Sequence, residues 1–369
     1  MEEFSEKETH DSGNRRSFFK KSALIGLAAF LKPVANFASA TPVANVSKNY
    51  PVKPATSEKK ITILITADIH SQLNTHDEFF WENNQAVYRK RGGLAVLKTM
   101  IDTFRKENPD NTILYDGGDF FHGHAIASLT EGEALIPIFN KLNYDLLLPG
   151  NWEVVYKKKK MLYDLGHSNA AKICANMWHK TEDENNGELV YPPYWIKYIA
   201  GVKIGVIGYT DHLIPKRQSP AYSEGLRFEH AEKTVAKYVK LLRETEGCAV
   251  VLLATHMGLA QQVGLANNPV SAGVDCIIGA DTHERVRVPI EGKYTKVIEC
   301  GAFGSFLGKL DLIIENGQLK DIRYHLLDVD PGKYPADKTI QAMVDKTYLP
   351  YKAELQKVIG TAQFDDFNA

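Results

Sequence analysis

Five short motifs in this 369-residue sequence place oxygen- and nitrogen-bearing side chains directly after apolar, β-rich runs. They are Asp68-Ile69-His70, Gly117-Gly118-Asp119, Gly150-Asn151, Thr255-His256 and Asp281-Thr282-His283. Each motif alone is typical of an ordinary turn. Because the loops at the carboxyl ends of strands converge in an α/β sheet, five such motifs in succession predict one shared site.

The residue types at this site indicate metal chemistry. A mixed set of carboxylate, imidazole and amide ligands suits Mn²⁺, Zn²⁺ or Fe ions rather than a thiolate-preferring metal. Two such ions about 3.5–4 Å apart lower the pKa of a bridging water and clamp the oxygens of an in-line displacement. No protein nucleophile is then needed, and the sequence contains no Gly-x-Ser-x-Gly motif. The sequence therefore predicts a two-metal hydrolytic site.

Alternating strands and helices must position these motifs. Strands are predicted over residues 61–66, 112–115, 145–148, 249–254 and 274–279, and helices over 92–106, 133–142, 229–244 and 336–359. Residues 194–199 and 202–208 predict a hairpin, and residues 296–300, 307–314 and 319–328 predict a β-rich end with a turn at Asn316-Gly317. This alternation predicts an α/β sandwich in which helices cover the sheets.

The bulk composition is that of an ordinary soluble globular protein, with 44% hydrophobic and 24% charged residues. A formal net charge of −1 gives no electrostatic attraction toward nucleic acid, so we expect no nucleic-acid partner. The four cysteines form no Cys-x-x-Cys pair and lie in or beside apolar runs; they are Cys174, Cys248, Cys276 and Cys300. Packing in the core is their expected role, and a disulfide is the alternative.

The N-terminus has the pattern of an export signal. Asn14 to Lys20 is polar and basic, a stretch of nine mostly apolar residues follows from Ala23 to Leu31, and Ala38-Ser39-Ala40 is a small-residue cleavage site. The apolar stretch is shorter than the roughly 20 residues that span a bilayer, so we expect no stable membrane anchor. The pair Arg15-Arg16 resembles the twin-arginine signal, which implies export of a folded, metal-loaded protein to the periplasm or beyond.

The order of the five motifs resembles that of the calcineurin-like metallophosphoesterases, from about residue 60 to 360. Within them it is similar to the branch of periplasmic 5′-nucleotidases and SoxB-type thiosulfohydrolases. The resemblance implies an α/β fold, a four-layer α-β-β-α sandwich with mixed sheets, and a dinuclear metal centre. It implies that one ion is held by Asp68, His70 and His283, that the other is held by Asn151, His256 and Asp281, and that Asp119 bridges them.

The predicted domain organisation follows from the same pattern. Residues 1–40 are the signal peptide and residues 41–59 a Pro-, Ser- and Thr-rich linker. Residues 60–330 form the catalytic domain, and residues 331–369 a C-terminal linker helix and tail. Members of this branch continue into a domain that recognises the leaving group. We expect such a specificity domain either to be truncated from this sequence or to be a separate chain or carrier protein.

Two motifs depart from the pattern of the family. Asp281 stands where the family motif Gly-His-x-His has its first His. A carboxylate is a competent ligand for the same ions and would make the second site more anionic, which favours Mn²⁺ or Fe. The alternative is that Asp281 only caps the turn that follows it.

The second departure is Trp152, which replaces the His of the nucleotidase motif Gly-Asn-His-Glu, while Val155 replaces an Asp that would orient that His. Trp cannot protonate a leaving alkoxide, and this form resembles the SoxB-type enzymes, which cleave a sulfur–sulfur bond. His122 and His124 are alternative acids, or else solvated loop residues. The candidate catalytic residues are thus Asn151, Trp152, His122 and His124.

Three functions are compatible with these observations. The first is an exported phosphoesterase of the 5′-nucleotidase type that acts on a nucleotide or another small-molecule phosphoester with a metal-bridging water. The second is a thiosulfohydrolase, indicated by Trp152 and the twin-arginine pair. The third is a metal-bound protein that binds without catalysis, indicated by the missing His and the missing specificity domain.

Overall fold

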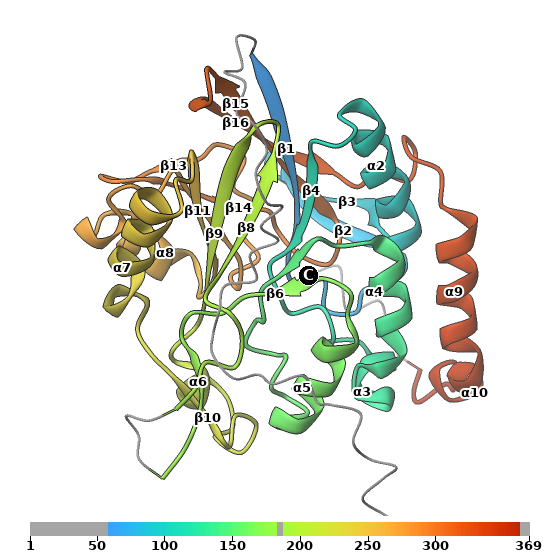
Figure 1. Ribbon diagram of the computed structural model, residues 1–369. Helices are drawn as coiled ribbons and strands as arrows, with labels where there is room; N and C mark the ends of the chain where they lie inside the picture. Colours follow the sequence, from blue (N-terminus) through green and yellow to red (C-terminus); the bar gives the residue numbers. More distant parts are fainter. Residues whose placement is uncertain (1–57, 183–186, 362–369) are drawn as a thin grey trace, which may run out of the picture. The chain divides into compact units, whose positions relative to one another are not determined.

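The computed structural model describes residues 58–182 and 187–361, in which two six-stranded sheets form the framework (Figure 1). The first sheet has the order β16 (Gln318–Asp328), β15 (Phe306–Glu315), β1 (Lys59–Thr66), β4 (Thr112–Asp116), β5 (Leu146–Leu147) and β6 (Ala171–Lys172). The second has the order β13 (Ile290–Glu291), β14 (Lys296–Glu299), β12 (Cys276–Gly279), β11 (Val250–His256), β9 (Val202–Thr210) and β8 (Tyr194–Ile199). Both sheets are mixed, since β1 pairs parallel with β4 and antiparallel with β15, and β9 pairs parallel with β11 and antiparallel with β8.

Successive side chains of each strand point to opposite faces of its sheet, and the apolar side chains on the two inner faces pack against each other. Ile63 and Ile65 of β1 lie in a core shared with Val250 and Leu252 of β11. The intervening residue Leu64 lies in a different core, on the outer face of the first sheet. Each fully buried aliphatic side chain of this kind contributes roughly 1.5–3 kcal/mol.

Helices cover the outer face of each sheet. On the first sheet they include α2 (Leu94–Glu107), α4 (Ile136–Leu142), α5 (Lys157–His167) and α9 (Lys338–Tyr348). On the second they are α7 (Val235–Lys240) and α8 (Leu259–Ala266). Figure 1 shows α7 and α8 on the left, the two sheets between, and α2, α4 and α9 on the right. The predicted four-layer α-β-β-α sandwich is confirmed.

Three predicted helices differ from the observed ones. The helix predicted over residues 133–142 begins as a 3₁₀ turn, Glu133–Leu135, before α4. The helix predicted over 229–244 is divided, because Thr234 leaves the helical backbone with φ −131°; its hydroxyl is hydrogen-bonded to that of Tyr209 at 2.9 Å. Within the helix predicted over 336–359, α9 ends at Tyr348. It is followed by a 3₁₀ turn at Pro350 and then by α10 (Lys352–Leu355).

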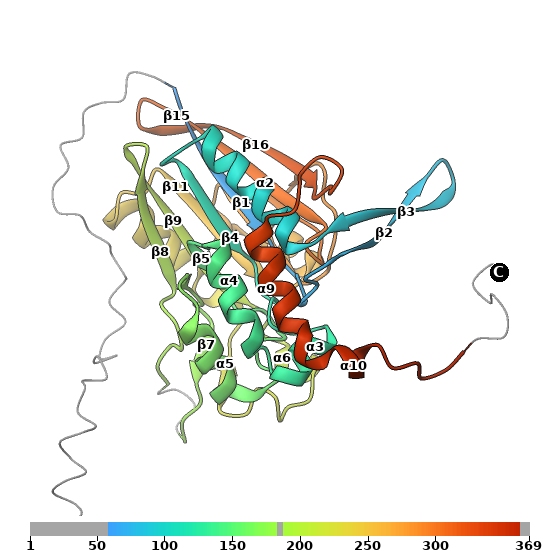
Figure 2. The same ribbon diagram turned by 90° about the vertical axis from the view of Figure 1, so that its right-hand side faces the viewer.

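Several elements were not predicted from the sequence. The largest is a hairpin of β2 (Thr75–Glu82) and β3 (Gln85–Gly92), which Figure 2 shows extending away from the layered sheets. Its tight turn is Asn83-Asn84, with φ of 49° and 64°, the left-handed pair that a two-residue hairpin requires. The helices α5 and α8 and the short strands β7 (Met177–His179) and β10 (Leu226–Phe228) were also missed.

Two further expectations can be compared with the described residues. All four cysteines are free and buried, as expected for core packing, and the alternative of a disulfide is wrong. Across residues 58–182 and 187–361, none of the helices has the length and apolar character needed to cross a membrane. The predicted signal peptide and nearly all of the predicted linker lie outside the described residues.

Candidate metal centre

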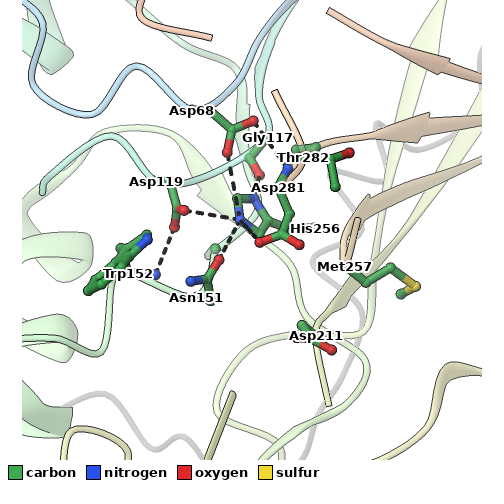
Figure 3. Close-up of polar contacts among 12 residues, drawn as sticks. Asp68, Gly117, Asp119, Asn151, Trp152, Asp211, His256, Met257, Asp281 and Thr282 are labelled. Atoms are coloured by element: carbon green, nitrogen blue, oxygen red, sulfur yellow. Dashed lines mark hydrogen bonds and ion pairs between the residues drawn. The ribbon is translucent and has the colours of Figure 1, made fainter. Parts of the chain in front are cut away.

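The structure brings the predicted ligand residues together at one edge of the two sheets. Asp68 follows β1, Asp119 follows β4 and Asn151 follows β5, all in the first sheet. His256 is the last residue of β11 and Asp281 follows β12, both in the second sheet. Figure 3 shows that these five side chains point toward one another across the gap between the sheets. His70 and His283 complete the set, from the loops after Asp68 and Asp281.

The loops that carry these residues have an unusual backbone. Positive φ angles occur at Asp68 (53°), His70 (49°), Asp119 (58°), Asp281 (92°) and His283 (60°). Such angles are uncommon for residues other than Gly and are found at functional sites, where surrounding contacts enforce them. Here the enforcing contacts are hydrogen bonds between neighbouring loops, from Asp68 N to Gly118 O at 2.9 Å and from His70 N to Asp119 O at 2.8 Å.

One group of potential ligands consists of Asp68, His70 and His283. The Nε2 atoms of the two histidines lie 3.1 Å apart, and Asp68 Oδ1 lies 3.7 Å from His283 Nε2. Asp68 is fully buried, yet its Oδ1 has no hydrogen-bond partner. A buried oxygen without a partner is costly, and a cation beside this atom would remove that cost.

A second group consists of Asp68, Asp119 and His256. His256 is fully buried, and its Nδ1–H donates to Gly117 O at 2.7 Å. In the neutral imidazole this bond leaves the Nε2 lone pair directed at the centre, the tautomer that a metal-binding His needs. Nε2 lies 3.2 Å from Asp119 Oδ2 and 3.0 Å from the side-chain amide of Asn151. Because Asp119 Oδ2 is also 3.8 Å from His70 Nε2, Asp119 lies between the two groups.

Asp281 has a different environment from the other carboxylates. Its backbone N–H donates to Asp68 Oδ2 at 3.2 Å, and its Oδ1 lies 3.8 Å from His256 Nε2. Both carboxylate oxygens accept hydrogen bonds from Arg217, at 2.7 and 2.9 Å. The alternative that Asp281 caps the following turn is therefore wrong, because its carboxylate binds this guanidinium and faces the centre. Arg217 was not predicted, since nothing in its local sequence marks it.

The pKa values at the centre reflect burial opposed by neighbouring charge. Burial lowers the pKa of His70 to about 4, so its imidazole is neutral, the form that binds metal. Burial would raise the pKa of Asp119, but the positive charge of His256 and hydrogen bonds from His256 and the Trp152 backbone N–H lower it to about 2. Burial would lower the pKa of His256, but Asp119 and Asp68 raise it well above 6.5. Burial also raises the pKa of Asp68.

A pocket of about 590 Å³ opens beside the first group. It is lined by His70, Gln72, His76, Asp77, Glu78, Phe79, His122, Gly123, His124, Trp152, His283 and Phe303. The hairpin strand β2 forms one wall of this pocket, so the unpredicted hairpin contributes directly to the site.

Three of the candidate catalytic residues face this pocket. The indole of Trp152 stacks on the ring of His122, with centroids 4.4 Å apart and planes 9° apart. The backbone N–H of Trp152 donates to Asp119 Oδ1 at 2.8 Å, which fixes this residue beside the centre. His122 Nδ1 is buried without a partner, whereas His124 is exposed at the start of α3 (Ala125–Thr130). Burial lowers the pKa of both histidines, which disfavours their protonated forms.

Residues 61–285 match the calcineurin-like phosphoesterase family, a stretch that covers more than half of the chain. The chain belongs to this family. It is 26% identical over 310 residues to a 5′-nucleotidase of Vibrio cholerae, a match that covers 74% of this chain and 52% of that protein. The chain thus spans about half the length of this curated relative. The family and this relative indicate a hydrolase.

Solved structures show the same fold. The sulfate thiohydrolase SoxB from Thermus thermophilus superposes with a TM-score of 0.71 at 20% identity, over 82% of this chain and 62% of that one. A 5′-nucleotidase precursor from Thermus thermophilus superposes with a TM-score of 0.70 at 20% identity, over 82% of this chain and 61% of that one. The predicted resemblance to this branch of the phosphoesterases is confirmed.

The calcineurin-like phosphoesterases use divalent metals, and the residues present fit such ions. The orphan Oδ1 of Asp68 faces the imidazole of His283, and the Nε2 atoms of His70 and His283 lie 3.1 Å apart. Carboxylate and imidazole donors of this kind suit Mn²⁺, Zn²⁺ or Fe. The first group is therefore a candidate metal site.

Glu153 supports the backbone of the candidate centre and was missed by the sequence prediction. Its Oε2 accepts hydrogen bonds from the backbone N–H groups of Asp119 at 2.9 Å and Gly150 at 2.6 Å. Its Oε1 accepts another from Phe120 N at 3.0 Å. Burial raises the pKa of Glu153 to about 8. One side chain thus ties the loop of Asp119 to the loop of Asn151, and its place two residues after Asn151 was the available signal.

Proposed function

We propose that this chain is an exported, metal-dependent phosphoesterase of the 5′-nucleotidase type that uses water as its nucleophile. The observation that carries the proposal is the unpaired, fully buried oxygen of Asp68, which faces two imidazoles and lies beside Asp119. When bound, two divalent ions would supply an activated bridging water and a clamp on the attacked phosphoryl group. The relatives of the chain support phosphoester chemistry.

The protein's own residues have distinct roles in this proposal. Asp68, His70 and His283 would hold one Mn, Zn or Fe ion, and Asn151, His256 and Asp281 would hold the other, with Asp119 between them. Gly117 O fixes the tautomer of His256, and Glu153 fixes the backbone of Asp119. Because these loops are held by buried hydrogen bonds, the ligands are preorganised before substrate arrives.

The pocket beside the first group suggests how a nucleotide would be held. Phe79 and Phe303 line it together with the stacked rings of His122 and Trp152. Aromatic faces of this kind accept a planar base by stacking. We propose a nucleotide or a similarly sized phosphoester as the substrate, with its phosphoryl group at the centre and its leaving group in this pocket.

The proposed location rests on residues 1–40, which read as a twin-arginine signal before the linker 41–59, the catalytic domain 60–330 and the C-terminal helix and tail 331–369. A variant with both Arg15→Lys and Arg16→Lys would accumulate in the cytoplasm of a host that has this pathway. Unchanged export of that variant would contradict the route.

Thiosulfohydrolase chemistry is the second candidate, favoured by one observation. Trp152 occupies the position beside Asp119 and Asn151 where a phosphoesterase of this branch would place an acid, and a leaving thiolate needs little acid help. The decisive experiment assays metal-reconstituted protein on 5′-AMP, UDP-glucose, bis-p-nitrophenyl phosphate and an S-sulfocysteine substrate, with metal-free protein as the control. Phosphoester turnover is expected. Turnover of the S-sulfocysteine substrate alone would exclude a phosphoesterase, and no turnover with two ions bound would indicate a binding protein.

A further inference from the structure

The second half of the centre, formed by Asn151, His256 and Asp281, is contacted by the last residue of a short helix. This helix is α6 (Ile214–Arg217), and the side chain of its last residue extends into the centre. The guanidinium of Arg217 makes two parallel hydrogen bonds to Asp281, and its Nη1 also donates to Asp211 Oδ2 at 2.8 Å. Asp211 is fully buried, and Arg217 pairs with it and with Asp281 at the same time.

The next residue, Gln218, reaches a second member of this half. The side-chain amide of Asn151 can hydrogen-bond with its polar neighbours through both its nitrogen and its oxygen when the nitrogen faces the centre. The nitrogen then donates to Asp281 Oδ1 at 2.9 Å and to His256 Nε2 at 3.0 Å, and the oxygen accepts from Gln218 Nε2 at 2.9 Å. In this orientation Asn151 presents a donor to the centre, and a donor cannot bind a cation.

The two halves therefore differ in how their ligand atoms are satisfied. In the first half, Asp68 Oδ1 is buried and has no partner. In the second half, both oxygens of Asp281 are bound by Arg217, and the oxygen of Asn151 is bound by Gln218. A bidentate Arg–carboxylate pair is among the strongest polar contacts in proteins, and a guanidinium does not lose its proton at any working pH.

We propose that Arg217 and Gln218 act as a built-in substitute for the second metal ion, so that the second ion is weakly held and exchangeable while the first is tight. This inference rests on the proposed function and specifies how its centre is regulated. To bind the second ion, Asp281 must release Arg217 and Asn151 must turn its oxygen from Gln218 to the centre. The side chain of Arg217 is 40% exposed, so it can move into solvent when an ion displaces it.

The test titrates the metal-free full-length protein with Mn²⁺ and measures binding by calorimetry and low-temperature electron paramagnetic resonance. Two ions at neighbouring sites give an exchange-coupled spectrum, whereas a single ion does not, so second-site occupancy is read without any activity assay. For the wild-type protein we expect one tight ion and a second that binds at least about tenfold more weakly. For Arg217→Met, the second ion should bind about tenfold or more tightly than in the wild type, with the first unchanged.

Two further variants make the result decisive. Asp281→His removes the carboxylate that Arg217 binds and supplies an imidazole, so it should also strengthen the second site even if Arg217→Met folds poorly. Arg243→Met is the matched control, because Arg243 pairs with Asp275 away from the centre and should leave both affinities unchanged. Thermal unfolding of each variant shows whether it is folded.

The inference and the proposed function fail in different ways. Equal affinity of the second ion in the wild type and Arg217→Met, or a weaker second ion in Arg217→Met, would overturn the inference. The weaker ion would mean that Arg217 instead orients Asp281 as a ligand. Failure of the wild-type protein to bind any Mn²⁺ tightly would contradict the proposed function itself.

Discussion

The two halves of the candidate metal centre use similar residues in opposite environments. The half beside the pocket, with Asp68, His70 and His283, is partly open, and the side chain of His283 is 36% exposed. The half beside α6 includes His256, which is fully buried, and Asp281, whose side chain is 5% exposed. Yet Asp68, which is fully buried and belongs to both groups, keeps an unpaired oxygen, whereas both oxygens of Asp281 are bonded to Arg217. The availability of a ligand thus depends on its protein partners and not on its burial.

The largest effect is expected from removing the residue that joins the halves. Asp119 Oδ2 lies 3.8 Å from His70 Nε2 and 3.2 Å from His256 Nε2. We predict that Asp119→Ala loses at least one metal per chain and that hydrolysis falls by more than the roughly 10–100-fold typical of supporting residues. Elemental analysis and steady-state kinetics would measure both, with Asp102→Ala on the distant helix α2 as the control. Retention of two metals per chain would rule out the bridging role.

As the pH falls, the two halves should release their ions at different pH values. Protons compete with metal for a His, so the half whose His has the higher pKa releases its ion first as the pH falls. Burial lowers the pKa of His70 to about 4, whereas Asp119 and Asp68 overcome the burial of His256 and raise its pKa well above 6.5. Asp68 belongs to both groups, so its own raised pKa does not distinguish them.

We therefore predict that the ion beside α6 weakens by about tenfold per pH unit below the raised pKa of His256. The ion beside the pocket should stay bound until the pH approaches the pKa of His70, which is about 4. Equilibrium dialysis at stepped pH would follow the loss of each ion. His230→Gln removes an exposed histidine and should leave the profile unchanged. Simultaneous loss of both ions, or earlier loss of the pocket ion, would contradict the assignment.

Protonation of the same two histidines also makes the free energy of unfolding of the metal-free protein depend on pH. Because the folded pKa of His70 lies below its ordinary value of 6.5, its contribution is present above about pH 6.5 and is lost as the pH falls toward 4. The folded pKa of His256 is raised, so its contribution is present below about pH 6.5 and is lost as the pH rises through the raised folded pKa.

Much of the fold and of the pocket half could be predicted because the information is local. An apolar strand followed by a short polar turn identifies both a strand and the residue at its carboxyl end, as for β1 and Asp68. The alternation of Ile63, Leu64 and Ile65 between two cores likewise follows from the period of a strand. That these residues bind metal stays a prediction.

The rest depends on contacts between distant segments or on weak local patterns. Arg217 and Asp281 are 64 residues apart, and α6 is too short to show a helical period. The strand β2 was missed because only Phe80 and Glu78 of its eight residues are buried, so it lacks an apolar alternation. The role of Glu153 was missed because a buried carboxylate is identified only by the backbone N–H groups that surround it.

The smallest predicted effect concerns Trp152, which adjoins both halves through Asp119. A positioned general acid contributes typically 10²–10⁴-fold, mainly when the leaving group is poor. Trp152→His introduces such an acid, but Val155 cannot orient it, so we expect only a severalfold gain in turnover of 5′-AMP, far below this range. Bis-p-nitrophenyl phosphate, whose leaving group needs little acid help, should gain less.

Two variants separate acid catalysis from a change in the pocket. Trp152→Phe preserves an aromatic face against His122 without supplying a proton, so it should give no gain on either substrate. Adding Val155→Asp to Trp152→His should increase the gain on 5′-AMP, because the carboxylate can hold the new imidazole in one orientation. If neither the single nor the double variant improves turnover of 5′-AMP, His122 or another group already supplies the proton, and the Trp does not limit phosphoester hydrolysis.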